Sequence, residues 1–188
     1  YYTTPVIINL SDAPYTHDGI VTPRNSAPGI NGGLENGIIS IESATGGLAD
    51  DILIGSNGDN TLYGSQGNDL LLGGLGNDTY AFGNDWGTDV VSDDGGNDTF
   101  SFAAATVPVT FVRGVTAACP SGTCATNGTN QVTNENGQIE NFVGGSAADT
   151  FILTHGSSLS GSINGNGGTD TLDLSAATTA LNLVLTGL

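Results

Sequence analysis

The stretch GGLADDILIGSNGDNTLYGSQGNDLLLGGLGNDTYAFG, residues 46–83, repeats one pattern every nine positions. Glycine opens each repeat, at residues 46, 55, 64 and 73. An acid or its amide follows five residues later, as Asp51, Asn60, Asp69 and Asp78. A large side chain stands two residues further on, as Leu53, Leu62, Leu71 and Tyr80. Such a period indicates a repeat architecture in which each unit packs against its neighbours.

Each unit has the length of a turn of about six residues and a strand of about three, and glycine permits the positive φ angles of a tight turn. In a three-residue strand only the middle residue points inward, which explains one large apolar residue per unit. Two units complete a coil, so we expect Leu53 to stack on Leu71 and Leu62 on Tyr80. The sequence therefore predicts an all-β fold, a parallel β-roll or β-solenoid with a thin apolar core.

The acids stack in the same way as the apolar residues. Asp51 lies one coil from Asp69, and Asn60 one coil from Asp78, with about 4.8 Å between coils. Carboxylates at that spacing repel each other unless a cation lies between them. Carboxylates and turn carbonyls form the flexible oxygen cage that Ca²⁺ prefers. Zinc would require histidine or cysteine, and the array has neither.

The charge of the chain fits a cation-binding protein. The formal net charge is −17, and Arg24 and Arg113 are the only basic residues besides two histidines. A disordered acidic chain is the alternative, because high net charge opposes compaction. The 37% share of hydrophobic residues and their fixed period favour a fold with neutralised carboxylates. A nucleic-acid partner is excluded by the lack of a basic surface, and no apolar run is long enough to span a membrane.

The repeat unit is used a second time. Residues 139–152, IENFVGGSAADTFI, match residues 41–54, IESATGGLADDILI, at seven of fourteen positions, and GNGGTDTLD follows at 165–173. The chain then divides into four parts. These are a strand and turn-rich segment (1–40), a first repeat block (41–102), an insertion (103–138), and a second block with a C-terminal strand (139–188).

The insertion breaks the nine-residue period. We expect it to form a loop or hairpin that projects from the scaffold. Cys119 and Cys124 are separated by a Pro-Ser-Gly turn, which favours a local disulfide and an oxidising location over two free thiols.

The units GGLGNDTYA, GSQGNDLLL and GNGGTDTLD resemble the nonapeptide GGxGxDxUx of the RTX family, where U is large and apolar. This resemblance implies a parallel β-roll that binds calcium in its turns. Ala49 and Ala147 replace the fourth-position glycine and put the geometry of those two turns in question. Asn60 departs from aspartate, which implies a weaker or incomplete site. The metal ligands implied are Asp51, Asn60, Asp69, Asp78, Asp89, Asp98, Asp149 and Asp170.

Other candidate residues give weaker signals. His17 and His155 lack a nucleophile motif such as GxSxG, so we expect no catalytic role for them. Trp86 is expected to cap the end of the roll, with sugar stacking as the alternative. The two arginines lie outside the repeats, which argues against a lyase of the β-helix class and against an enzyme generally.

These features favour a secreted, calcium-stabilised structural protein of the cell surface. The resemblance is closest in character to bacterial adhesins and S-layer proteins, and a filament subunit is a third form of the same role. We expect self-association, with contact to a glycan or cell surface as a further expectation. Two alternatives stay open: an RTX accessory module of a secreted enzyme or toxin, and a carbohydrate-binding module.

Overall fold

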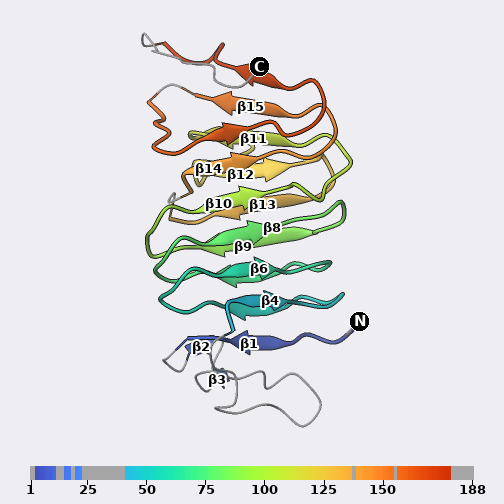
Figure 1. The fold of residues 1–188 in the computed structure, drawn as a ribbon, viewed down its shortest axis with the longest axis vertical. Coiled ribbons are helices and arrows are strands. Elements are labelled where there is room, and N and C mark those ends of the chain that lie inside the picture. Colours follow the sequence, from blue (N-terminus) through green and yellow to red (C-terminus); the bar gives the residue numbers. More distant parts are fainter. Residues whose placement is uncertain are drawn as a thin grey trace.

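The computed structural model describes residues 3–11, 15–17, 20–22, 41–136, 139–154 and 156–178. These residues contain seventeen β-strands and no helix, which confirms the all-β fold. Two sheets face each other across the core, and the chain of the first block alternates between them as it winds along the long axis (Figure 1). A separate hairpin joins β2 (Tyr15–His17) and β3 (Ile20–Thr22).

The larger sheet has nine strands and the smaller has six. The order in the larger sheet is β1 (Ile7–Asn9), β5 (Ile52–Ile54), β7 (Leu70–Leu72), β9 (Thr88–Ser92), β13 (Gln131–Asn134), β12 (Thr123–Thr126), β11 (Thr110–Arg113), β15 (Thr150–Leu153) and β17 (Thr171–Asp173). The order in the smaller sheet is β16 (Ile163–Asn164), β14 (Asn141–Val143), β10 (Thr99–Ser101), β8 (Thr79–Ala81), β6 (Thr61–Tyr63) and β4 (Ser43–Thr45).

The nonapeptides fold as the period predicts. β5, β6, β7 and β8 each have three residues and pair in parallel with the strand one coil away. Leu53 pairs with Leu71, and Leu62 pairs with Tyr80. All four side chains are fully buried. The stacking of one apolar residue per unit, with two units per coil, is therefore confirmed.

An aromatic cluster forms where the first block ends. Trp86 is fully buried, with its ring 4.9 Å from that of Phe102 and 6.1 Å from that of Phe82, measured between centroids. The coil between Leu70 and its partner Val90 is two residues longer than the preceding coil, and Trp86 lies in this longer connection. Trp86 thus packs inside the core, which differs from the expected cap and leaves no ring face for a sugar.

Replacing Trp86 by alanine is expected to cost about 3–5 kcal/mol of unfolding free energy, because the cluster cannot collapse around so large a cavity. Denaturant unfolding in saturating calcium measures this cost. Val115, which is 74% exposed, provides the matched control, since Val115→Ala removes no buried contact. Equal unfolding free energies for the two variants would contradict the assignment of Trp86 to the core.

The insertion lies within the larger sheet and does not project from it. β11, β12 and β13 form an antiparallel meander, with β13 parallel to β9 and β11 parallel to β15. On the opposite side β10 pairs directly with β14, without any insertion. The expectation of a projecting hairpin fails because these strands carry their own inward apolar residues. Phe111, for example, stacks on Phe151 with centroids 4.6 Å apart.

The two cysteines are joined, as the spacing predicted. The disulfide connects Cys119 with Cys124 and packs with Val112 and Ile152 in a small apolar cluster beside the meander. Arg113 ties this part of the chain to the second block, donating hydrogen bonds to the carbonyls of Ile139 at 3.2 Å and Ser158 at 3.1 Å.

Some expectations concern residues outside the described ranges. The strand expected at the C-terminus, His155 and the turn-rich residues 23–40 all lie there. The strand expected near the N-terminus is β1, which pairs in parallel with β5. None of the described residues forms a helix of the length and apolarity needed to cross a membrane.

Candidate metal centre

The acids of the repeats form columns along the roll. In the first column, the Asp51 backbone N–H donates to Asp69 Oδ1 at 2.7 Å, and the Asp69 N–H donates to Asp89 Oδ1 at 2.9 Å. The same hydrogen bond therefore recurs from coil to coil. The sixth residue of one unit donates its backbone N–H to the carboxylate of the sixth residue one coil further on, and we call this sixth position the acid position. Each bond fixes one carboxylate oxygen and aims the other into the loops.

The second column lies on the other side of the roll. Asn60 N–H donates to Asp78 Oδ1 at 2.7 Å, Asp78 N–H to Asp98 Oδ1 at 2.8 Å, and Asp98 N–H to Glu140 Oε2 at 2.8 Å. Glu140 continues the column into the second block, a role that the sequence comparison did not assign. The sequence contained this signal, since Glu140 directly precedes β14 as Asp69, Asp78 and Asp98 directly precede their strands.

A third column belongs to the second block. Val109 N–H donates to Asp149 Oδ1 at 2.8 Å, and Asp149 N–H donates to Asp170 Oδ1 at 2.9 Å. All eight residues implied by the resemblance thus stand in one of three columns. Asp149 is buried, whereas Asp170 is exposed.

Four of these carboxylates leave an oxygen unused. Oδ2 of Asp69, Asp78, Asp89 and Asp98 is buried and has no hydrogen-bond partner within the described part of the chain. Each of the four residues is at most 2% exposed. A buried charged oxygen without a partner is strongly destabilising, so native proteins pair it or place it on a metal ion.

Burial also changes the acidity of these four groups. Loss of hydration raises the pKa of Asp69, Asp78 and Asp98 to about 7 and that of Asp89 to about 8. Backbone N–H donors oppose the rise, and neighbouring carboxylates add to it. A cation bound at these oxygens would favour the ionised form and reverse the effect.

The remaining buried acids have both oxygens occupied by the protein. Oδ2 of Asp51 accepts from the Gly47 N–H at 2.5 Å, and Oδ2 of Asp149 accepts from the Gly145 N–H at 2.6 Å. Asn60 forms the same loop contact, its Oδ1 accepting from the Ser56 N–H at 2.6 Å, although its Nδ2 is buried without a partner in the described part of the chain. We call these three turns closed loops, because the second residue of the unit donates back to its own acid position.

The turns that begin at Gly64, Gly73 and Gly165 differ, and we call them open loops. Their second residues have positive φ angles: 80° at Ser65, 97° at Gly74 and 65° at Asn166. Their fourth residues do so as well: 129° at Gly67, 110° at Gly76 and 119° at Gly168. A Cβ at Gly67 would also lie 2.5 Å from the Ala49 carbonyl oxygen, so only glycine fits there.

The positions of the two kinds of loop explain the alanines of the fourth position. Ala49 and Ala147 both lie in closed loops, where no positive φ is needed. A closed loop thus begins each set of repeats, and open loops stack on it. The shared departure from glycine marks the first turn of a block.

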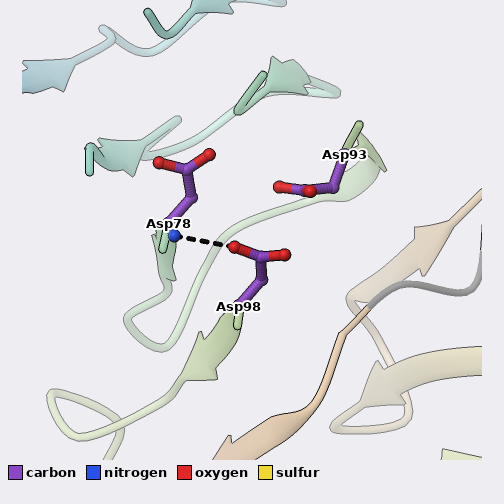
Figure 2. A group of neighbouring side chains, drawn as sticks. All are labelled: Asp78, Asp93 and Asp98. Atoms are coloured by element: carbon purple, nitrogen blue, oxygen red, sulfur yellow. Dashed lines mark hydrogen bonds between the residues drawn. The ribbon is translucent and has the colours of Figure 1, made fainter. Parts of the chain in front are cut away.

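Asp93 is a buried acid that the sequence analysis missed. Its carboxylate lies with those of Asp78 and Asp98, and one oxygen from each falls within 4.8 Å of the others (Figure 2). The register of β7 with β9 places Asp93 one coil after Gly73, at the first position of a unit. The nonapeptide pattern assigns glycine there, which is why the acid was overlooked.

The side-chain atoms that these loops offer to a metal ion are oxygens. The buried carboxylates among them have no positively charged side chain of a described residue beside them. This chemistry fits a hard divalent cation of flexible coordination, and Ca²⁺ more than Mg²⁺. A family comparison decides the matter: residues 45–80 match the RTX calcium-binding nonapeptide repeat in four copies. The chain carries RTX repeats. Calcium is therefore the cation of this β-roll.

The match ends at residue 80, but the column geometry continues beyond it to Asp98, Glu140 and Asp170. Comparisons with curated proteins and with solved structures give no significant match.

Proposed function

We propose that this chain is a calcium-stabilised structural protein of the extracellular surface, of the adhesin, S-layer or filament type, whose folding and assembly depend on Ca²⁺. The observation that carries the proposal is a set of four buried carboxylate oxygens that have no partner among the described residues, at Asp69, Asp78, Asp89 and Asp98. Their ionised forms are compatible with the fold only when a cation neutralises them.

Such a fold suits a compartment rich in calcium. Binding free energy becomes folding free energy when the site exists only in the folded chain. Sites of this flexible oxygen type in extracellular modules bind calcium with dissociation constants of about 10⁻⁴–10⁻³ M. The disulfide between Cys119 and Cys124 supports the same location, since disulfides persist under oxidising conditions.

A structural role is supported by how the acids and the described arginine are used. The buried aspartates hydrogen-bond the backbone of neighbouring coils, and Arg113 holds the meander against the second block. Burial lowers the pKa of the Arg113 guanidinium, although the nearby Glu140 carboxylate opposes the shift. We therefore assign these groups to architecture and place no catalytic step on them.

Self-association is proposed through the ends of the roll. The larger sheet ends in β1 and β17, and the smaller in β16 and β4. A terminal strand of a sheet uses one side for pairing within that sheet, and its other side is able to pair with a further chain. Linear stacking of copies would extend the two sheets in the direction in which the coils already stack.

The test is a calcium titration of the metal-free chain, followed by circular dichroism and light scattering. Folding into β-structure with a rise in particle mass is the expected result. Folding to a stable monomer would overturn the assembly and favour an accessory module of a secreted enzyme or toxin. The absence of any structural response to calcium would overturn the proposal as a whole.

A further inference from the structure

One group of side chains departs from the repeat at two positions at once. Tyr80 stands where the three preceding units have leucine, and Asp93 stands where they have glycine. The two residues are in contact: the Tyr80 hydroxyl donates to Asp93 Oδ2 at 2.5 Å. Two independent departures that meet in one hydrogen bond indicate a site with a composition of its own.

We propose that Asp93 makes the site of Asp78 and Asp98 a three-carboxylate calcium site, which fills before the other sites of the roll, with Tyr80 as the residue that positions Asp93. This inference rests on the calcium dependence proposed above and adds an order of binding to it. We call this group the tri-aspartate site.

The carboxylates of the tri-aspartate site are buried and face a common space (Figure 2). Asp98 is 0% exposed, and Asp78 and Asp93 are each 1% exposed. Oδ2 of Asp78 and Oδ2 of Asp98 have no hydrogen-bond partner in the described part of the chain. Two unsatisfied carboxylate oxygens at such depth indicate a missing positive charge, independently of how many acids are nearby.

Gly73 leaves the space open. A Cβ on Gly73 would collide with the Tyr80 hydroxyl and with Asp78 Oδ2, and it would lie 2.6 Å from Asp93 Oδ2. Three oxygens from three residues thus converge over one glycine, where any side chain would exclude them. The glycine is required here for the approach of ligands, in addition to its role in the turn.

Asp93 is held in place by two donors. Besides the Tyr80 hydroxyl on Oδ2, the Gly95 N–H donates to Oδ1 at 2.8 Å. Tyr80 is itself fixed in the core, with its ring edge-to-face against Phe100 at a centroid distance of 6.1 Å. The third carboxylate is therefore oriented before the ion arrives, which lowers the cost of ordering it on binding.

Charge distinguishes this site from the one between Asp69 and Asp89. Neighbouring carboxylates repel each other, and a divalent cation bound between them converts that repulsion into attraction. Calcium affinity in oxygen sites rises with the number of charged ligands and with rigidity. Three fixed carboxylates therefore bind calcium more tightly than two.

The experiment is a calorimetric calcium titration of the full chain and four variants, with circular dichroism in saturating calcium as the folding control. Asp93→Asn removes the charge at nearly constant volume, and Asp93→Gly restores the residue of the repeat. Tyr80→Phe removes only the hydroxyl. Asp94→Asn is the matched control, because Asp94 is the exposed neighbour of Asp93.

We expect the wild-type chain to show one tight site above the others. Asp93→Asn and Asp93→Gly should weaken that site by about tenfold or more, Tyr80→Phe by a smaller factor, and Asp94→Asn by less than about twofold. Tb³⁺, bound in place of calcium and excited through tyrosine, should lose luminescence at its tightest site in Asp93→Asn.

Equal titrations of Asp93→Asn and Asp94→Asn would overturn the inference while leaving the calcium-dependent fold intact. If both Asp93 variants fail to fold, Tyr80→Phe decides, and an unchanged tight site in that variant would overturn the inference as well. A wild-type chain that binds no calcium would instead refute the proposed function on which the inference rests.

Discussion

Without calcium, the chain is expected to lose stability as the pH rises from about 5 to about 8, and calcium is expected to reverse this dependence. The groups responsible are Asp69, Asp78 and Asp98, with pKa values of about 7, and Asp89, with a pKa of about 8. Their ordinary value is 3.8.

The sign follows from proton binding. A carboxyl whose pKa is higher in the folded chain binds its proton more tightly there, so the folded state is favoured at low pH. That advantage is fully present below a pH of about 4 and is lost as the pH rises through the folded pKa values. A rise of about 3 in pKa corresponds to about 4 kcal/mol for one isolated group. Neighbouring carboxyls share part of this effect, so their contributions do not add fully, and we expect about 4 kcal/mol or more for the four together.

That loss is comparable to the total stability of an ordinary domain, which is about 5–15 kcal/mol. With calcium the chain should become more stable as the pH rises, because the ion binds only the deprotonated carboxylates and protons compete with it. Thermal unfolding followed by circular dichroism, in EDTA and in excess calcium, measures both slopes. The double variant Asp69→Asn with Asp89→Asn is the control and should flatten both. Equal unfolding midpoints in EDTA at pH values of about 5 and about 8 would contradict the burial of ionisable carboxyls.

The repeat part of the fold follows from the sequence because one rule repeats. A nine-residue period with one apolar residue per unit predicts the strands, their inward residues and the stacking of Leu53 on Leu71. The acid columns follow from the same period. Where the nine-residue period is interrupted, it no longer predicts which residues form strands or where they pair. The expectation that residues 103–138 project from the scaffold therefore misses the meander of β11, β12 and β13 within the sheet.

The site was predictable to the extent that it obeys the repeat. Asp93 lies at a glycine position, and its role depends on its contact with Tyr80, which no local pattern reveals. The difference between closed and open loops depends on the backbone of the second residue, as in the N–H of Gly47 that reaches Asp51. Ala49, Asn60 and Ala147 mark the closed loops in the sequence. The motif does not say what these departures do, so the hydrogen bonds of the structure were needed to separate the two kinds of loop.

The second large effect concerns that difference: Asp69→Asn is expected to lower the calcium stoichiometry, whereas Asp51→Asn is expected to leave it unchanged. Asp69 lies in an open loop, and its buried Oδ2 has no hydrogen-bond partner in the part of the chain that the structure describes. Both oxygens of Asp51 accept backbone N–H groups, from Val6 at 2.7 Å and Gly47 at 2.5 Å. Asp93 also has a donor on each oxygen, but its carboxylate converges with those of Asp78 and Asp98, whereas Asp51 belongs to no such group among the described residues. The chain contains a natural precedent in Asn60, whose closed loop forms around an uncharged amide.

The two variants should also differ in stability. Asp51→Asn replaces one acceptor by an amide donor that faces an N–H, which should cost about 2 kcal/mol both in calcium and in EDTA. Asp69→Asn loses a calcium ligand, which should cost about 3 kcal/mol at calcium about 100-fold above the dissociation constant. In EDTA near pH 7, where Asp69 is partly ionised, the same change should stabilise the fold, because it removes a buried charge.

A change of sign with calcium for Asp69→Asn, beside a constant loss for Asp51→Asn, is therefore the pattern to test. Denaturant unfolding in calcium and in EDTA gives the stabilities, and equilibrium dialysis gives the number of bound ions. Asp59→Asn is the matched control, because Asp59 is an exposed acid whose carboxylate accepts only surface hydrogen bonds from Asn77. Equal losses of bound calcium in the Asp51 and Asp69 variants would mean that closed loops open on binding. The hydrogen bond from the Gly47 N–H to Asp51 Oδ2 would then exist only in the metal-free chain, and calcium would replace the N–H at that oxygen.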